Sequence, residues 1–240
     1  MVIMTNEKFQ SFSDDLEAFV WPEEDEKQQA KRQRILFAAT ELFVQLGYRK
    51  TSIDAIAKRA ALAKGTIYLY YGNKAEIVLH AIAFEKLTHL KQLAEHIRDN
   101  LSAEDVLRTF IVVAVVMSRE MPLTASLLRG DQEISFAMAE VDEPLKVAVG
   151  KMRIDAVLEL LDDATNHELS RSRLKILSHT LVDLLNSVFL SPHTLGAEIP
   201  PIKYAQNLAD MLIDGLVNSN DRQSSDTLKP LYKKLSKRSP

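Results

Sequence analysis

Side chains that can contact a phosphate or a base edge are concentrated in residues 51–74 of this 240-residue chain. Hydroxyl and lysine ammonium groups alternate there with apolar positions, and one glycine would let the backbone approach a duplex. The candidate contact residues are Thr51, Ser52, Lys64, Gly65, Thr66, Tyr68, Tyr70 and Lys74. Hydroxyl and ammonium groups donate hydrogen bonds to phosphate oxygens, and side chains that reach base edges distinguish one sequence from another. The pattern therefore predicts binding to double-stranded DNA.

Short helices are expected to position these side chains. Ser52 can cap a helix that ends in an alanine-rich turn at 61–63. A two-turn helix over about 64–70 follows, and Asn73 caps a long helix that runs to about residue 98. A helix over about 27–46, stopped by glycine, precedes the group. This layout is typical of a helix-turn-helix, whose second helix enters the major groove.

The position of each residue in these helices predicts its role. Ile67 is expected to pack inward while Tyr68 points outward. Thr51 and Ser52 precede a helix, so their hydroxyl and amide groups are expected to face one phosphate strand. Lys74 lies in the first turn of a helix, where the helix dipole disfavours a cation, and we expect it to face a phosphate. The alternative is that the tyrosines are core aromatics and the lysines only solvate a surface.

Charge is distributed unevenly along the chain, although the formal net charge is only −3. Residues 1–26 carry one lysine against eight acids, whereas residues 27–80 carry ten Lys and Arg against three acids, a net charge of +7. A compact basic block of this kind is an electrostatic footprint for phosphate. The acidic segment before it is expected to be poorly ordered, with docking of Phe19 and Trp21 on the rest of the protein as the alternative.

Several other classes of function are disfavoured by composition and motifs. The chain has no cysteine, and no metal-binding, P-loop or catalytic-serine motif occurs in it. We therefore expect no enzyme activity, no metal and no cofactor. The longest strongly apolar run, 109–118, is short of the roughly 20 residues that a membrane span needs. A cytoplasmic protein without a membrane partner is expected.

Residues 35–79 resemble the tetracycline-repressor-like (TetR/AcrR) family of bacterial regulators. The matching residues are Ile35, Ala39, Leu42, Phe43, Gly47, Tyr48, Thr51, Ser52, Ile56, Ala57, Ala60, Lys64, Gly65, Thr66, Ile67, Tyr68, Tyr70, Asn73 and Lys74. The resemblance implies an all-α fold, in which a three-helix DNA-binding head is followed by a larger helical ligand-binding and dimerisation domain. The chain departs from the family at Ala61, where glycine is usual, at Leu69, where tyrosine is common, and at Tyr71, where phenylalanine is usual. At Ala61, a left-handed turn residue with a Cβ atom would be strained.

Four parts of the chain are expected. They are an acidic, poorly ordered extension at 1–26, a DNA-binding domain at 27–75, a ligand-binding and dimerisation domain at 76–220, and a basic tail at 221–240. Prolines and capping residues predict further helices over about 102–120, 144–163, 170–190 and 201–218. The β-branched run at 111–116 leaves a buried strand as the alternative for the first of these.

Large apolar side chains in the second domain suggest a pocket for a small apolar or aromatic effector, with a few polar groups to orient it. The candidate pocket residues are Phe84, His89, Phe110, Met117, Met121, Met152, His179 and Asp183. Ordinary core packing is the alternative for each of them. Wide apolar faces on the last two helices predict a homodimer, which a near-palindromic operator requires. The candidate interface residues are Leu177, Leu181, Leu184, Leu208, Met211, Leu212 and Gly215.

The function that these patterns favour is a homodimeric repressor that a small apolar ligand releases from its operator. The alternative is an all-helical ligand-binding protein or enzyme that has lost DNA binding. The +7 charge of residues 27–80 and the intact set of contact residues favour the regulator.

Overall fold

The structure is a computed structural model that describes residues 7–22, 25–94, 101–117, 121–128, 131–190 and 199–217. Every regular element within these ranges is an α-helix, which confirms the predicted all-α class. The helices are α1 (Glu7–Val20), α2 (Glu26–Leu46), α3 (Ile53–Arg59), α4 (Lys64–Tyr70), α5 (Lys74–Ala94), α6 (Ala103–Met117), α7 (Pro122–Leu128), α8 (Gln132–Glu140), α9 (Glu143–Ala164), α10 (Arg171–Leu190) and α11 (Pro201–Val217). The strand alternative for 111–116 is wrong, because this run lies within α6.

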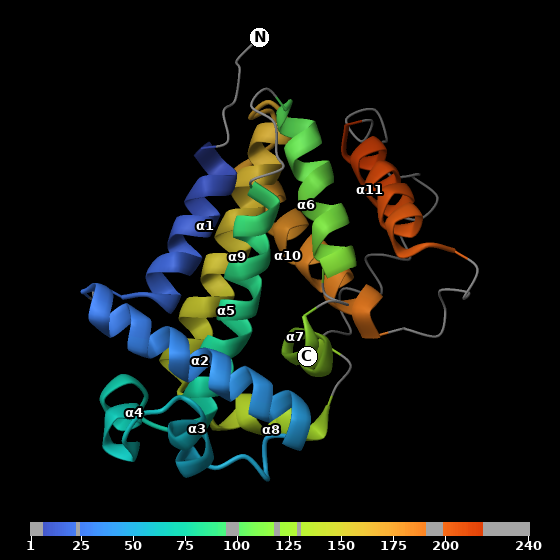
Figure 1. The fold of residues 1–240 in the computed structure, drawn as a ribbon. Helices are drawn as coiled ribbons and strands as arrows, with labels where there is room; N and C mark the ends of the chain where they lie inside the picture. The colour runs from blue at the N-terminus through green and yellow to red at the C-terminus, as the bar shows by residue number, and fades with distance from the viewer. Residues whose placement is uncertain are drawn as a thin grey trace, which may run out of the picture.

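Helices α2, α3 and α4 form a small head at one end of the molecule (Figure 1). The Ser52 hydroxyl caps α3 by accepting a hydrogen bond from the Ala55 amide at 3.1 Å. Gly47 ends α2 with a φ of 80°, a conformation that glycine adopts without strain. Ile56 of α3 and Ile67 of α4 are fully buried against α2 residues in one hydrophobic core. The head therefore packs as the predicted helix-turn-helix.

Helix α5 leaves the head and runs through the centre of the body (Figure 1). Asn73 caps it, since its Oδ1 atom accepts a hydrogen bond from the Glu76 amide at 2.8 Å. Helix α2 crosses it, α1 lies along it, and α7 and α8 pack near it. One core cluster joins α5 to the head, and a second is built by α6, α9, α10 and α11. Helix α5 is thus the continuous connection between head and body.

The expectation of a poorly ordered extension at 1–26 is wrong for residues 7–20, which form α1 and pack on α5 and α9. The Phe19 ring stacks on His80 with centroids 4.4 Å apart, and Trp21 meets Phe84 edge-on at 5.6 Å. Burial lowers the pKa of His80 to about 4, so its neutral ring packs as an aromatic. The docking alternative for Phe19 and Trp21 is confirmed. Residues 1–6 and the predicted basic tail at 221–240 lie outside the described residues.

The turn between α3 and α4 contains the strain that the sequence predicts. Ala61 has a φ of 51°, in the left-handed region that favours glycine. The Arg34 guanidinium holds this turn by donating to the carbonyls of Ala60 and Ala61. The strain is therefore maintained by contacts from α2.

Replacing Ala61 with glycine is expected to stabilise the protein. Relief of the left-handed strain, less the extra freedom that glycine gives the unfolded chain, should raise the free energy of unfolding by about 0.5–1 kcal/mol. Urea denaturation measures this change. Ala63→Gly is the matched control, because Ala63 has an ordinary φ of −72° and should gain nothing. Equal stability of Ala61→Gly and the parent protein would show that the turn is not strained.

Candidate nucleic-acid interface

Helix α4 presents a polar and aromatic face to the outside of the head. Ile67 is fully buried, whereas the side chain of Tyr68 is 51% exposed and that of Leu69 is 84% exposed. The predicted inward and outward orientations of Ile67 and Tyr68 are confirmed. Lys64 and Gly65 are also exposed, and Thr66 is half-buried. An exposed tyrosine beside an exposed lysine can reach into a groove without unfolding the head.

Gly65 lies at the start of this face, and its environment in the protein is open. A Cβ atom added there would meet no protein atom within 4 Å. Packing within the chain therefore does not require glycine at this position. Close approach of another molecule's backbone would require it, in agreement with the predicted DNA contact.

Lys64 is paired with an acid of the preceding helix. Its Nζ atom lies 2.7 Å from Asp54 Oδ2, and both side chains are largely exposed. This hydrogen bond raises the pKa of Lys64, so the ammonium group stays charged. Because exposed ion pairs contribute little stability, a phosphate can replace the carboxylate at small cost.

The prediction places the Thr51 hydroxyl on the outside of the head, but the structure buries it. The residue is 1% exposed, and its hydroxyl donates to the carbonyl oxygens of Gly47 at 2.8 Å and Leu42 at 3.1 Å. These bonds fold the chain after α2 back onto its C-terminal end. The predicted phosphate contact of the Thr51 hydroxyl is therefore wrong, while Ser52 remains exposed at the start of α3.

Lys74 also has an internal role. Its ammonium group donates to the carbonyl oxygens of Tyr48 at 2.7 Å and Thr51 at 2.9 Å, and it lies 4.1 Å from the centre of the Tyr48 ring. Burial lowers its pKa. The helix-dipole argument correctly indicated that this cation needs a partner, but the partners are carbonyl groups within the head. In place of the predicted phosphate contact, Lys74 forms hydrogen bonds that join the start of α5 to the loop before α3.

We expect Lys74→Met to destabilise the protein by about 1–3 kcal/mol, because two carbonyl groups lose a charged donor. Thermal or urea denaturation measures the loss. The salt dependence of DNA binding by the folded variant should keep its slope, since no phosphate contact is removed. Lys50→Met, at an exposed position of the same loop, is the control for charge. Unchanged stability with a slope lowered by about one would restore the phosphate role.

Tyr70 is half-buried at the seam between α4 and α2. The Arg32 guanidinium lies 5.2 Å from the Tyr70 ring centre and 5.0 Å from that of Tyr71. Arg32 and Tyr71 are themselves buried. This cation–π arrangement positions Tyr70 at the edge of the α4 face, so its predicted phosphate contact stays a prediction.

Helix α8 connects the body to the loop that Lys74 holds. The Tyr48 hydroxyl donates to Glu140 Oε2 at 2.5 Å, and the Arg49 amide donates to Glu133 Oε2 at 3.0 Å. The Arg49 guanidinium lies 5.9 Å from the centre of the Phe136 ring. Sequence reasoning missed this junction, because its two sides are more than 80 residues apart. Any shift of α8 would move the start of the helix-turn-helix.

The predicted pocket residues are distributed over two cores. Phe84 and Met152 belong to the first cluster, whereas Phe110 packs on the second. Met121 is buried, His89 is half-buried, and its Nδ1 atom is 2.8 Å from the Glu85 carbonyl. His179 and Asp183 are exposed, and the side chain of Met117 lies outside the described residues. The structure does not bring this set together into one wall.

A groove of about 330 Å³ lies on the head, beside the turn between α3 and α4. Its lining residues are Arg34, Phe37, Ala38, Glu41, Arg59, Ala60 and Ala61. The two arginines are engaged within the head, Arg34 with the turn carbonyls and Arg59 with the Glu41 carboxylate. None of the predicted effector residues lines this groove.

The predicted dimer residues divide into two groups. Leu181 is buried in the second core, and Leu177, Leu184, Leu208 and Leu212 are half-buried. Helix α11 packs chiefly on α6, through the fully buried Ala205, Ala209 and Ile213. Met211 is 67% exposed and Gly215 is exposed. Only these last two therefore lie clear of the packing within one chain.

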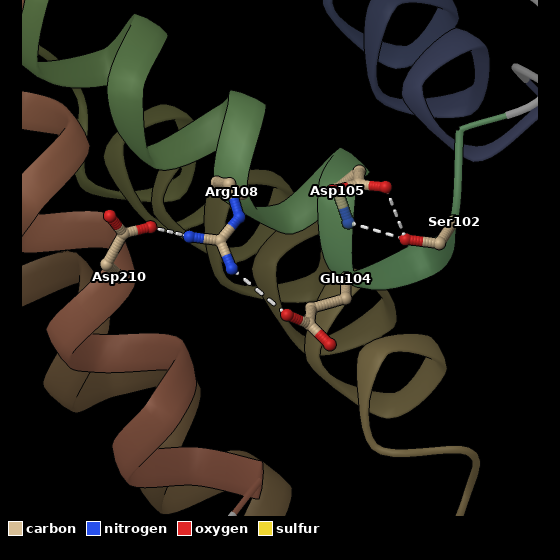
Figure 2. Close-up of polar contacts among 5 residues, drawn as sticks. All are labelled: Ser102, Glu104, Asp105, Arg108 and Asp210. Atoms are coloured by element: carbon tan, nitrogen blue, oxygen red, sulfur yellow. Dashed lines mark hydrogen bonds and ion pairs between the residues drawn. The ribbon is translucent and has the colours of Figure 1, made fainter.

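Ion pairs fix α11 on α6. Arg108 of α6 forms ion pairs with Asp210 of α11 and with Glu104 one turn earlier (Figure 2). Ser102 caps α6, accepting from the Asp105 amide at 3.1 Å and donating to its carboxylate at 2.7 Å. These bonds give a partner to an amide in the first turn of α6, where amide groups lack helical partners.

The described part of the chain contains no helix with the length and apolar character needed to cross a membrane. Within the same residues, no group of three or more His, Cys, Asp and Glu side chains could hold a metal ion.

Comparison with known proteins relates the α2–α5 region to bacterial regulators. The model of the tetR family of bacterial regulatory proteins matches residues 35–81. A fatty acid metabolism regulator protein of Bacillus subtilis is 31% identical over 105 residues, which cover 44% of this chain and 49% of the relative. An uncharacterized HTH-type transcriptional regulator, YhgD, of the same organism is 30% identical over 121 residues, 50% of this chain and 63% of the relative. The matches thus span about half to two thirds of these relatives.

Solved structures share the fold over about four fifths of this chain. The fatty acid degradation regulator FadR of Bacillus halodurans superposes with a TM-score of 0.55 at 16% identity, over 78% of this chain and 97% of that chain. NalD of Pseudomonas aeruginosa, a repressor of a multidrug efflux pump, superposes with a TM-score of 0.52 at 22% identity, over 81% of this chain and 98% of that chain. At these identities the likeness concerns the fold alone.

Proposed function

Because this chain belongs to the tetR family of bacterial regulatory proteins, we propose that it is a sequence-specific DNA-binding transcriptional regulator. The observation that carries the proposal is the exposed face of α4, with Lys64, Gly65 and Tyr68 open to the outside, within residues 27–80 whose net charge is +7. Base readout would come from Tyr68 and Thr66, and phosphate contacts from Lys64 and Ser52. The curated relatives are regulators rather than enzymes, which argues against the enzyme alternative.

The proposed regulator acts as a homodimeric repressor. Two heads related by a two-fold axis would place their α4 helices in successive major grooves, about 34–36 Å apart. The binding site is accordingly near-palindromic. A relative from Mycolicibacterium smegmatis is an activator, 32% identical over 71 residues. Whether this protein represses or activates transcription is therefore tested by the reporter experiment below.

The proposed effector is a small, largely apolar molecule that binds the body and weakens DNA binding. The role of the Bacillus subtilis relative in fatty acid metabolism supports an apolar effector. Helix α5 and the α8 junction with Tyr48 and Arg49 offer a physical connection between body and head. A ligand that favours a head spacing unsuited to successive grooves shifts the population away from the DNA-competent state. By linkage, bound DNA lowers the affinity of the protein for the ligand by the same factor as the ligand lowers its affinity for DNA.

Selection from random DNA tests the proposal. The purified protein should enrich one near-palindromic sequence, and a promoter carrying that sequence should be repressed in a reporter strain. A protein with Lys64 and Tyr68 replaced by alanine is the control. Failure to enrich any sequence above that control would contradict DNA-binding regulation, and activation of the reporter would contradict repression alone.

A further inference from the structure

The C-terminal end of α1 packs against the first turns of α5, next to the head (Figure 1). Phe19 is half-buried there, against the cluster of Ala75, Leu79 and Val141. Its ring stacks on the His80 ring, with centroids 4.4 Å apart and planes at 14° to each other. Helix α1 precedes the helix-turn-helix in the sequence, yet its end contacts the helix that follows it.

His80 connects this contact to the corner between α4 and α5. The residue is buried, and its ring meets the Tyr71 ring edge-on with centroids 5.1 Å apart. Its Nδ1 atom lies 3.0 Å from the Glu76 carbonyl oxygen, and the Glu76 carboxylate accepts a hydrogen bond from the Gly72 amide at 2.8 Å. His80 therefore contacts a residue of α1 on one side and the residues directly after α4 on the other.

Helix α4 depends on this corner for its orientation. All seven of its residues are described, and among them only Ile67 is buried. No side chain caps the start of the helix, and a helix of two turns is held by tertiary packing rather than by its own propensity. A second fixed point lies directly after it, where Tyr71 is 1% exposed and contacts both His80 and the Arg32 guanidinium, which is 5.0 Å from its ring centre. The direction of the exposed Tyr68 follows from these two points.

We propose that Phe19 is a positioning residue for DNA reading. By stacking on His80 it fixes the corner at Tyr71, and thereby the angle at which α4 presents Tyr68 to the major groove. The inference rests on the proposed DNA-binding function and assigns part of it to α1, outside the helix-turn-helix. Because Phe19 acts through other residues, its loss should change sequence preference and leave the phosphate contacts in place.

Replacement of Phe19 with alanine tests the inference. Affinity for the selected DNA site should fall about tenfold or more, because base contacts depend on the angle of α4. Affinity for unrelated DNA of the same length, and its salt dependence, should stay at the parental values, since no phosphate contact is removed. Phe19→Tyr keeps the ring and should keep the parental ratio of the two affinities. Fluorescence anisotropy with both DNAs over a salt series measures this ratio.

Controls separate positioning from a general loss of stability. Leu158→Ala truncates another half-buried apolar side chain, on α9 at the second core, and should keep the parental ratio. Phe19→Leu retains apolar volume without a ring to stack, should lower the ratio, and replaces Phe19→Ala if that variant is not folded by circular dichroism. A folded Phe19→Ala or Phe19→Leu protein with the parental ratio would overturn the proposal, as would an equal fall in Leu158→Ala.

A double-mutant cycle shows whether Phe19 acts through α4. Phe19→Ala should weaken binding to the selected site much less in a Tyr68→Ala protein than in the parent protein, because the contact that Phe19 positions is already absent. Equal losses in the two proteins would contradict action through Tyr68.

The same measurements distinguish this inference from the proposed function. If selection from random DNA enriches no sequence, the proposed function fails and the inference fails with it. If a sequence is enriched and its binding depends on Tyr68 but not on Phe19, the inference alone fails.

Discussion

Replacing both Lys64 and Tyr68 with alanine is expected to lower affinity for the selected DNA site by about a hundredfold or more. Each side chain is about half exposed on α4, and each direct contact contributes roughly 1–3 kcal/mol to specific binding. The Lys64 change alone should also reduce the slope of log affinity against log salt by about one, whereas Tyr68→Ala should act mainly on the preferred sequence. Fluorescence anisotropy over a salt series measures both effects.

Stability provides the internal check on this result. The removed atoms are exposed and the Lys64–Asp54 pair is a surface pair, so the melting temperature should change little. Lys151→Ala, on the body helix α9, matches the loss of charge and should bind DNA like the parent protein. A folded double variant with parental affinity would show that α4 does not read the DNA.

The DNA-binding elements could be predicted from the sequence because their signals are local. Ser52 lies three residues from the Ala55 amide that it caps, and Asn73 lies three from Glu76. Capping and helical spacing act within one turn, so α4 begins and ends at the predicted residues. The orientation of Ile67 and Tyr68 follows from the same periodicity.

Thr51 and Lys74 were misassigned because tertiary partners decide their roles. The carbonyl groups that Lys74 binds belong to Tyr48 and Thr51, 26 and 23 residues away. A sequence pattern shows that a cation needs a partner when it is buried or lies at the positive end of a helix dipole. It does not show whether that partner is a phosphate or a carbonyl group that is distant in the sequence.

The acidic extension was mispredicted for a different reason. Acidic residues outnumber basic ones by eight to one in residues 1–26, yet Leu16 and Val20 lie four residues apart on one helix face and are 5% and 0% exposed. Burial of this narrow apolar stripe against α5 and α9 stabilises α1. Composition averaged over the segment hides such a stripe.

The apolar surface of α11 extends beyond its contact with α6. Ala205, Ala209 and Ile213 form the stripe that packs within the chain, whereas Met211 and Gly215, four residues apart, lie on another face and are exposed. A small residue next to an exposed methionine allows a second helix to approach closely. This geometry makes Met211 and Gly215 better probes of the proposed dimer than Leu212, because Leu212 packs on the second core.

Met211→Glu combined with Gly215→Glu is expected to convert a dimer into folded monomers in sedimentation experiments. In the dimer, the two glutamate carboxylates of each α11 would lose their water against the α11 of the partner subunit. In the monomer they would face water. Affinity for the full near-palindromic site should fall by about a hundredfold or more, since linkage of two heads raises affinity by 10²–10⁴. Gln206→Glu adds a carboxylate at an exposed position of α11 away from this face and should stay dimeric. A double variant that sediments as a dimer would place the interface on other helices, and the proposed two-fold arrangement of the α4 helices would need a different axis.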